Sequence, residues 1–133
     1  MSARRTSSRN DSFTQSGAIR VLGMSFSGKH GANPGEQTKE QPIDVDVSVR
    51  LDVDQAARTD KLDETIDYDA IFKTCQEIVS KQSFKLLEAL AQAIVAELWR
   101  RYPLRAITVR VRKPRKLSGA TPEVQISRRR PRQ

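Results

Sequence analysis

The sequence of 133 residues predicts an α+β fold, a four-stranded antiparallel sheet with two helices on one face, in the order β-β-α-α-β-β. Residues 43–53 alternate between apolar and polar side chains, two amphipathic segments follow between 67 and 101, and two shorter alternating segments come last. A strand with one polar face is typical of antiparallel sheets, because parallel strands are usually covered on both faces.

The first strand is expected to begin at Ala18 and to end near Phe26, since Ile19 and Val21 alternate with polar positions. Residues 1–17 are rich in Ser, Arg, Asn and Gln and have no apolar period, which predicts a disordered N-terminal extension. A loop is expected over 28–35, which contains three glycines and one proline.

The second strand has the clearest pattern in the chain. Its apolar positions are every second residue: Ile43, Val45, Val47, Val49, Leu51 and Val53. Asp, Ser and Arg fill the positions between them, so one face of this strand is expected to be buried and the other exposed. Residues 54–66 are expected to form a polar connection.

Two helices are expected after this connection. The first begins near Asp67, a suitable N-cap, and ends near Gln82. Its apolar residues at helical spacing are Ile71, Cys75, Ile78 and Val79. The second is expected from about Ser83 to Arg101, with an apolar stripe made of Leu87, Leu90, Ile94 and Leu98.

The last two strands are predicted by the alternation of Ile107, Val109 and Val111 and by that of Val124 and Ile126. We therefore expect one domain over 18–128 and a basic C-terminal tail over 129–133.

The chain has a net charge of +8, yet residues 18–109 carry only −2 and residues 110–133 carry +8. The simpler interpretation of this basic segment is a solubilising tail, and the alternative is a nucleic-acid-binding module. Only 5% of residues are aromatic, which leaves few side chains on which nucleic-acid bases could stack and disfavours that alternative.

Composition excludes several classes of protein. The single cysteine, Cys75, rules out an intramolecular disulfide, and with one histidine, His30, a common Cys/His zinc site lacks ligands. No apolar run is long enough to cross a membrane. We expect a cytoplasmic protein that binds no metal and gains stability from self-association, because a domain of this size buries only about two-thirds of its surface.

Four segments, taken together, resemble the dihydroneopterin aldolase family. They are HGANPGEQTKEQ over 30–41, TDKLDETIDYDAIF over 59–72, FKLLEALAQAIV over 84–95 and VRVRKP over 109–114. Each segment alone is weakly specific, and a lone Glu36, Tyr68, Glu88 or Lys113 is more often an ordinary solvated or packing residue. The four segments occur in the family's order, and the resemblance extends over about residues 19–128.

The resemblance implies a tunnelling fold (T-fold) whose sheets join into a multimeric barrel, and a retro-aldol cleavage of dihydroneopterin in folate synthesis. Family members use neither a metal nor another cofactor, because the pterin C6=N5 imine accepts the electrons of the broken bond. Their sites lie between subunits of tetramers or octamers. The alternative on the same fold is epimerisation of dihydroneopterin or its triphosphate at C2′.

The resemblance also implies the roles of individual residues. Lys113 would exchange the proton of the 2′-hydroxyl, Tyr68 would help to protonate C1′, and Glu36 would hold the hydroxylated side chain. Glu88 would bind the guanidine-like edge of the pterin, and the rest of the pocket would come from Leu87, Thr65, Ile66 and Ala32. The chain departs from the family pattern at Glu40, where Gly is frequent, and over 115–119, where an Ala-Pro-type segment is common.

Overall fold

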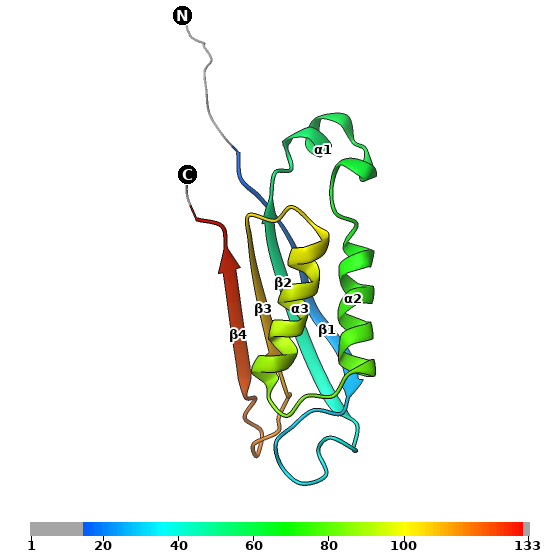
Figure 1. Ribbon diagram of the computed structural model, residues 1–133, viewed down its shortest axis with the longest axis vertical. Helices are drawn as coiled ribbons and strands as arrows, with labels where there is room; N and C mark the ends of the chain where they lie inside the picture. Colours follow the sequence, from blue (N-terminus) through cyan, green and yellow to red (C-terminus); the bar gives the residue numbers. More distant parts are fainter. Residues whose placement is uncertain (1–14, 132–133) are drawn as a thin grey trace, which may run out of the picture.

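The computed structural model describes residues 15–131, which form one antiparallel sheet with two long helices on one face (Figure 1). The strands are β1 (Gly17–Gly28), β2 (Gln41–Leu51), β3 (Ala106–Arg112) and β4 (Glu123–Arg129), in the spatial order β1-β2-β3-β4. The helices are α1 (Asp54–Thr59), α2 (Tyr68–Lys81) and α3 (Leu87–Arg101), with a 3₁₀ turn, η2 (Leu62–Glu64), before α2. The predicted fold class and element order are confirmed, with α1 and η2 as additions inside the segment expected to be a polar connection.

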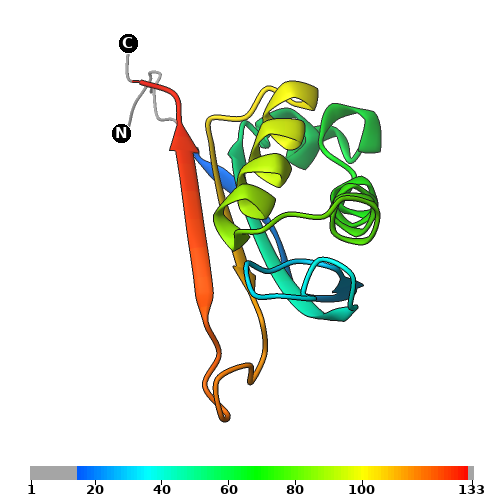
Figure 2. The same ribbon diagram turned by 60° about the horizontal axis from the view of Figure 1, so that its bottom comes forward.

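The core lies between the sheet and the helices α2 and α3, which cover the same face (Figure 2). On β2 the alternating apolar residues are buried, and they pair in register with those of β3: Val45 with Val111, Val47 with Val109 and Val49 with Ile107. The intervening side chains point to the opposite face, where Arg112 forms two hydrogen bonds with the carboxylate of Asp46 at 2.9 and 3.1 Å. The strict alternation therefore separates the core from the polar face, as expected.

The edge strand β1 contains an irregularity at Leu22 and Gly23. Its register with β2 shifts between Val21 and Met24, and Gly23 has a φ of 71°. The Gly23 N–H, which the ladder leaves unpaired, donates to Oδ1 of Asp46 at 2.7 Å. Leu22 points to solvent, with 64% of its surface exposed. The bulge returns Met24 to the buried face, so the strand continues to Gly28, beyond the expected end near Phe26.

Helix α2 begins as the sequence predicts and α3 does not. The carboxylate of Asp67 accepts a hydrogen bond from the Asp69 N–H at 2.9 Å, so Asp67 is the N-cap of α2. The prediction that the second helix begins near Ser83 is wrong, because α3 begins at Leu87. The backbone N–H and C=O of Phe84 instead bond to His30 and Gly31 of the β1–β2 loop, which holds this connection away from helical geometry.

The C-terminal arginines are attached to the folded domain. Strand β4 ends at Arg129, one residue beyond the boundary expected at 128, and the Arg130 N–H donates to the carbonyl of Arg105 at 2.9 Å. The guanidinium groups of Arg128 and Arg130 lie 5.4 and 4.7 Å from the centre of the Trp99 ring. Residues 1–14 of the expected N-terminal extension and 132–133 of the expected tail lie outside the described residues. Between residues 15 and 131, no helix combines the length and apolarity needed to cross a bilayer.

Candidate active site

Lys113 and Glu36 form a nearly buried ion pair at one end of the sheet. Lys113 follows the last residue of β3, and its Nζ lies 2.9 Å from Oε2 of Glu36 in the β1–β2 loop. The two side chains are 9% and 10% exposed. Two of the three residues predicted to be catalytic are therefore brought together by the fold.

The β1–β2 loop holds Glu36 from its own backbone as well. The Asn33 N–H donates to Oε1 of Glu36 at 3.0 Å. Gly31 has a φ of 153° and lies against this carboxylate, so a Cβ at position 31 would collide with Oε1 of Glu36. The hydrogen bond from Lys113 lowers the pKa of Glu36 to about 2, with contributions from Asn33 and from Lys116. Glu36 is consequently an anion at any physiological pH.

A second lysine bonds to the same carboxylate. Nζ of Lys116, in the turn between β3 and β4, lies 3.0 Å from Oε2 of Glu36 and 3.0 Å from Oε1 of Gln41. The Gln41 amide donates in turn to the carbonyl of His30 at 3.3 Å. Sequence analysis did not identify Lys116 as a site residue. The available signal was the departure of residues 115–119 from the family pattern.

His30 connects the β1–β2 loop to the helix layer. Its ring is fully buried, and Nδ1 accepts a hydrogen bond from the Phe84 N–H at 3.1 Å. The proton of the neutral ring is therefore on Nε2, which donates to the carbonyl of Val79 at 2.8 Å. Burial lowers the pKa of His30 below its usual range, and the charge of Lys113 adds to this shift. His30 thus fixes the loop that carries Ala32 and Glu36.

Leu87, Glu88 and Ala32 lie at the same end of the molecule as the ion pair, where α3 begins next to the β1–β2 loop (Figure 1). The Gly31 N–H donates to the carbonyl of Phe84 at 2.9 Å, which places Ala32 beside the segment leading into α3. Leu87 is half-buried, whereas Glu88 and Ala32 are exposed. Five of the eight predicted site residues are therefore gathered at this end.

Thr65, Ile66 and Tyr68 lie at the opposite end of α2. Val79, near the end of α2, contacts His30, and Tyr68 begins the helix eleven residues earlier, which corresponds to about 16 Å along its axis. Thr65 and Ile66 line a cavity of about 540 Å³ together with Tyr102 and Arg130. Tyr68 has 65% of its surface exposed. One chain therefore does not bring these three residues to Lys113.

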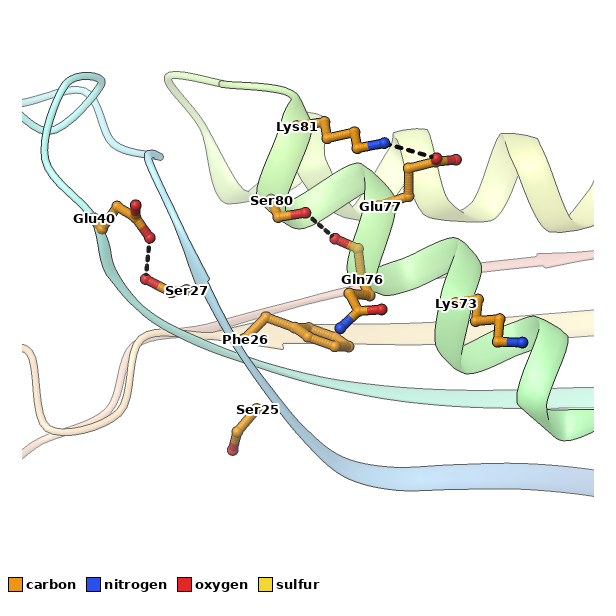
Figure 3. A pocket seen from close by; sticks show the side chains of 9 residues that line it. All are labelled: Ser25, Phe26, Ser27, Glu40, Lys73, Gln76, Glu77, Ser80 and Lys81. Carbon is orange, nitrogen blue, oxygen red and sulfur yellow. Dashed lines mark hydrogen bonds and ion pairs between the residues drawn. The ribbon is translucent and has the colours of Figure 1, made fainter.

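A further groove runs between β1 and α2 (Figure 3). Its volume is about 620 Å³, and none of the predicted site residues lines it. Phe26 of β1 points toward α2 across it, whereas Ser25 points away from the helix and Ser27 donates a hydrogen bond to Glu40 at 2.6 Å. Within residues 15–131, no three His, Cys, Asp or Glu side chains are grouped as metal ligands.

Comparison with known proteins identifies the family. The sequence model of the dihydroneopterin aldolase (FolB) family matches residues 19–127. The dihydroneopterin aldolase of Bacillus subtilis is 36% identical over 97 residues, which are 72% of this chain and 81% of the relative. The chain belongs to the dihydroneopterin aldolase family. The resemblance inferred from the four sequence segments is thereby confirmed.

Other dihydroneopterin aldolases agree in sequence and in fold. The Streptococcus pyogenes serotype M18 enzyme is 35% identical over 96 residues, covering 71% of this chain and 81% of its own. The crystal structure of the Escherichia coli dihydroneopterin aldolase in complex with neopterin superimposes with a TM-score of 0.80 at 25% identity. That match covers 84% of this chain and 98% of the Escherichia coli chain, so the sheet and helices of this dihydroneopterin aldolase family member are those of a known aldolase.

Proposed function

We propose that the protein is a dihydroneopterin aldolase, an aldehyde-lyase that cleaves 7,8-dihydroneopterin into 6-hydroxymethyl-7,8-dihydropterin and glycolaldehyde in folate synthesis. The family match, the relatives of that name and the neopterin complex of the Escherichia coli enzyme support the activity. The observation in this chain that carries the proposal is the nearly buried Lys113–Glu36 pair beside the start of α3, where Glu88 is exposed.

The proposed reaction needs a base, an acid and an electron sink. The amine of Lys113 takes the proton of the 2′-hydroxyl, directly or through a water, and the C1′–C2′ bond breaks to release glycolaldehyde. The bonding electrons move into the C6=N5 imine of the pterin, which leaves an enol-like intermediate. Protonation at C1′, with the help of the Tyr68 hydroxyl, gives the hydroxymethyl product. The pterin itself accepts the electrons, so the scheme requires no metal or added cofactor.

Glu88 and Glu36 are proposed to bind the two ends of the substrate. A carboxylate that accepts two parallel N–H bonds fits the guanidine-like edge of the pterin, and Glu88 is exposed in the first turn of α3. The unpaired N–H groups of that turn make the Leu87 backbone a suitable neighbour for the ring. Glu36 is ionised and held by Asn33, so it can accept bonds from the hydroxylated side chain. Ala32 precedes Glu36 in the same loop and lies beside the segment leading into α3.

We propose that the complete site forms between two subunits of a homo-oligomer. Thr65, Ile66 and Tyr68 lie about 16 Å along α2 from the level of His30, a separation longer than a bicyclic pterin. A second copy that contributes its Thr65, Ile66 and Tyr68 to the Lys113 end would complete the pocket. Strands β1 and β4 are both edges of the sheet and have hydrogen-bonding groups left to pair. Pairing of these edges into a closed barrel, as a tetramer or a stacked octamer, would supply that second copy.

The substrate is a small polar pterin, and we propose that the reaction takes place in the cytoplasm. The only cysteine, Cys75, is buried in α2 as a free thiol, a state that a reducing compartment maintains. The arginines of the C-terminal segment are used in part inside the domain, since Arg128 and Arg130 pack on Trp99. This arrangement disfavours nucleic-acid binding as the main function.

Product analysis tests the proposal. The purified protein is incubated with 7,8-dihydroneopterin without added metal, and the pterins are separated by chromatography. We expect 6-hydroxymethyl-7,8-dihydropterin and an equal amount of glycolaldehyde. Exclusive formation of the 2′-epimer would show that the protein is an epimerase instead. Absence of both products would contradict the proposal for the unphosphorylated substrate, and the triphosphate would then be tested in the same assay.

A further inference from the structure

Glu36 Oε2 is shared by two ammonium groups. Lys113 Nζ lies 2.9 Å from it and Lys116 Nζ lies 3.0 Å from it. The other oxygen, Oε1, accepts from the Asn33 N–H. One carboxylate therefore faces two positive charges, and only Lys113 is assigned a role by the proposed reaction. The presence of Lys116 in this cluster requires an explanation of its own.

The turn between β3 and β4 directs Lys116 toward Glu36. Arg115 has a φ of 57°, and its N–H donates to the Thr121 hydroxyl at 2.9 Å, which reverses the chain directly after Lys113-Pro114. Two backbone hydrogen bonds between Leu117 and Ala120, at 2.9 and 2.8 Å, close the turn. Lys116 lies between these two fixed points, and its ammonium group has a second acceptor, Oε1 of Gln41, at 3.0 Å. The turn and the hydrogen bond to Gln41 therefore fix the position of Lys116.

The charges explain what a second lysine does at this place. Lys113 accepts a proton only while its amine is neutral, and an adjacent carboxylate without another partner favours the ammonium form. The Lys116 ammonium group remains as the counter-ion of Glu36 when the Lys113 amine is neutral, so the remaining Glu36–Lys116 pair has no net charge. His30, which is buried, is a further titratable side chain close enough for its charge to be coupled to that of Lys113. Its ring is neutral in this arrangement, because Nδ1 accepts a hydrogen bond.

We propose that Lys116 is a positioning residue of the aldolase site. With Gln41, it holds the Glu36 carboxylate and neutralises its charge, so that the neutral amine of Lys113 forms more easily. This inference rests on the proposed function. Lys116 is 38% exposed at its side chain and remains open to solvent, whereas Lys113 is almost covered. The two lysines therefore have separate tasks: Lys113 moves the proton and Lys116 neutralises the carboxylate.

The test compares Lys116→Met with Lys116→Arg and with a control, Lys39→Met, which removes the same charge from an exposed position of the β1–β2 loop. The first measurement does not depend on turnover: a small amine-reactive reagent labels Lys113 over a range of pH, and mass spectrometry gives the extent. In Lys116→Met we expect the labelling midpoint to move up by about one pH unit. Lys116→Arg and Lys39→Met are expected to keep the wild-type midpoint.

The second measurement is the pH profile of turnover. In Lys116→Met, kcat at neutral pH is expected to fall about tenfold and to recover at higher pH, with KM within about twofold of the wild type. An unchanged labelling midpoint in Lys116→Met would overturn the inference, whatever the activity. A shifted midpoint in a protein that forms no aldolase product would support the role of Lys116 toward Lys113 and would contradict the proposed function alone.

Discussion

Lys113 and Glu36 are 77 residues apart in the sequence, and their side chains meet at 2.9 Å at the end of β3. The contact joins the β1–β2 loop to the end of β3, so it forms only when β1, β2 and β3 are paired. This dependence on the completed sheet makes the ion pair a good reporter of both folding and chemistry.

Lys113→Ala is expected to lower kcat by about 10²- to 10⁴-fold, the usual contribution of a general acid or base. Binding of neopterin is expected to stay within about threefold, because Glu36 keeps Lys116 as a partner and Glu88 is untouched. Stopped-flow turnover and a fluorescence titration with neopterin measure the two quantities. Lys73→Ala, at an exposed position of α2 beside the groove that none of the predicted site residues lines, serves as the control. Normal turnover by Lys113→Ala would refute the proposed mechanism.

Glu88→Gln keeps the shape of the side chain and removes its charge. The loss of charge-assisted hydrogen bonds of about 1.5–3 kcal/mol is expected to weaken neopterin binding by about 10- to 100-fold. Isothermal titration calorimetry gives the dissociation constants. Glu77→Gln is a matched control, since Glu77 is an exposed helical glutamate whose partner is Lys81 at 3.2 Å. Equal affinities of the wild type and Glu88→Gln would exclude Glu88 from pterin recognition.

The stability of the fold is expected to depend on pH through His30. The folded state keeps this ring neutral, so its pKa lies below the ordinary value of 6.5, whereas the unfolded chain binds a proton at that value. Unfolded chains therefore take up more protons than folded ones as the pH falls below 6.5, and folding becomes less favourable. Above that pH the contribution of His30 is complete.

His30→Ala tests this dependence. At pH 8 the variant is expected to lose about 2–4 kcal/mol, because it leaves a cavity and two unpaired backbone groups at Val79 and Phe84. The difference from the wild type is expected to shrink as the pH is lowered below 6.5. Urea denaturation at a series of pH values measures it, with the exposed neighbour Lys29→Ala as the control. A difference that is constant across this range would contradict a neutral His30.

The site between subunits is tested by mixing two defective variants. Lys113→Ala and Tyr68→Ala are expected to be poorly active alone, because each removes a group from every site. After unfolding together and refolding at equal amounts, about a quarter of the sites are expected to combine an intact Lys113 with an intact Tyr68 from another chain. Recovery of about a quarter of the wild-type activity supports the shared site. No recovery, with mixed oligomers verified by native mass spectrometry, would argue for a site within one chain.

Most of the secondary structure could be predicted because it follows local periodicity. The alternation in β2 and the spacing of Ile71, Cys75 and Ile78 in α2 depend only on which face is buried. The start of α3 could not be predicted, since Phe84 is withdrawn from the helix by His30, a residue 54 positions earlier. The bulge at Gly23 could not be predicted either, because the Asp46 carboxylate that accepts its N–H belongs to another strand.

The candidate site was predicted in part, through the family resemblance and not through local periodicity. Lys113, Glu36 and Glu88 were named through the family resemblance, and the fold brings them to one end of the sheet. The separation of Tyr68 from that end depends on the direction of α2, which no local pattern reveals. The position of Lys116 depends on a turn in which Arg115 adopts a positive φ. This conformation is uncommon for arginine, and nothing in the sequence predicts it.

The bulge at Leu22 and Gly23 has a consequence for how copies of the chain can meet. A long, regular edge strand is a template for open-ended fibrils, because any other strand can add to it in many registers. In β1 the ladder is interrupted at one fixed place, and the interruption is secured by a carboxylate of the neighbouring strand. A strand that adds to this edge must accommodate the kink, which removes the sliding registers on which fibril growth depends.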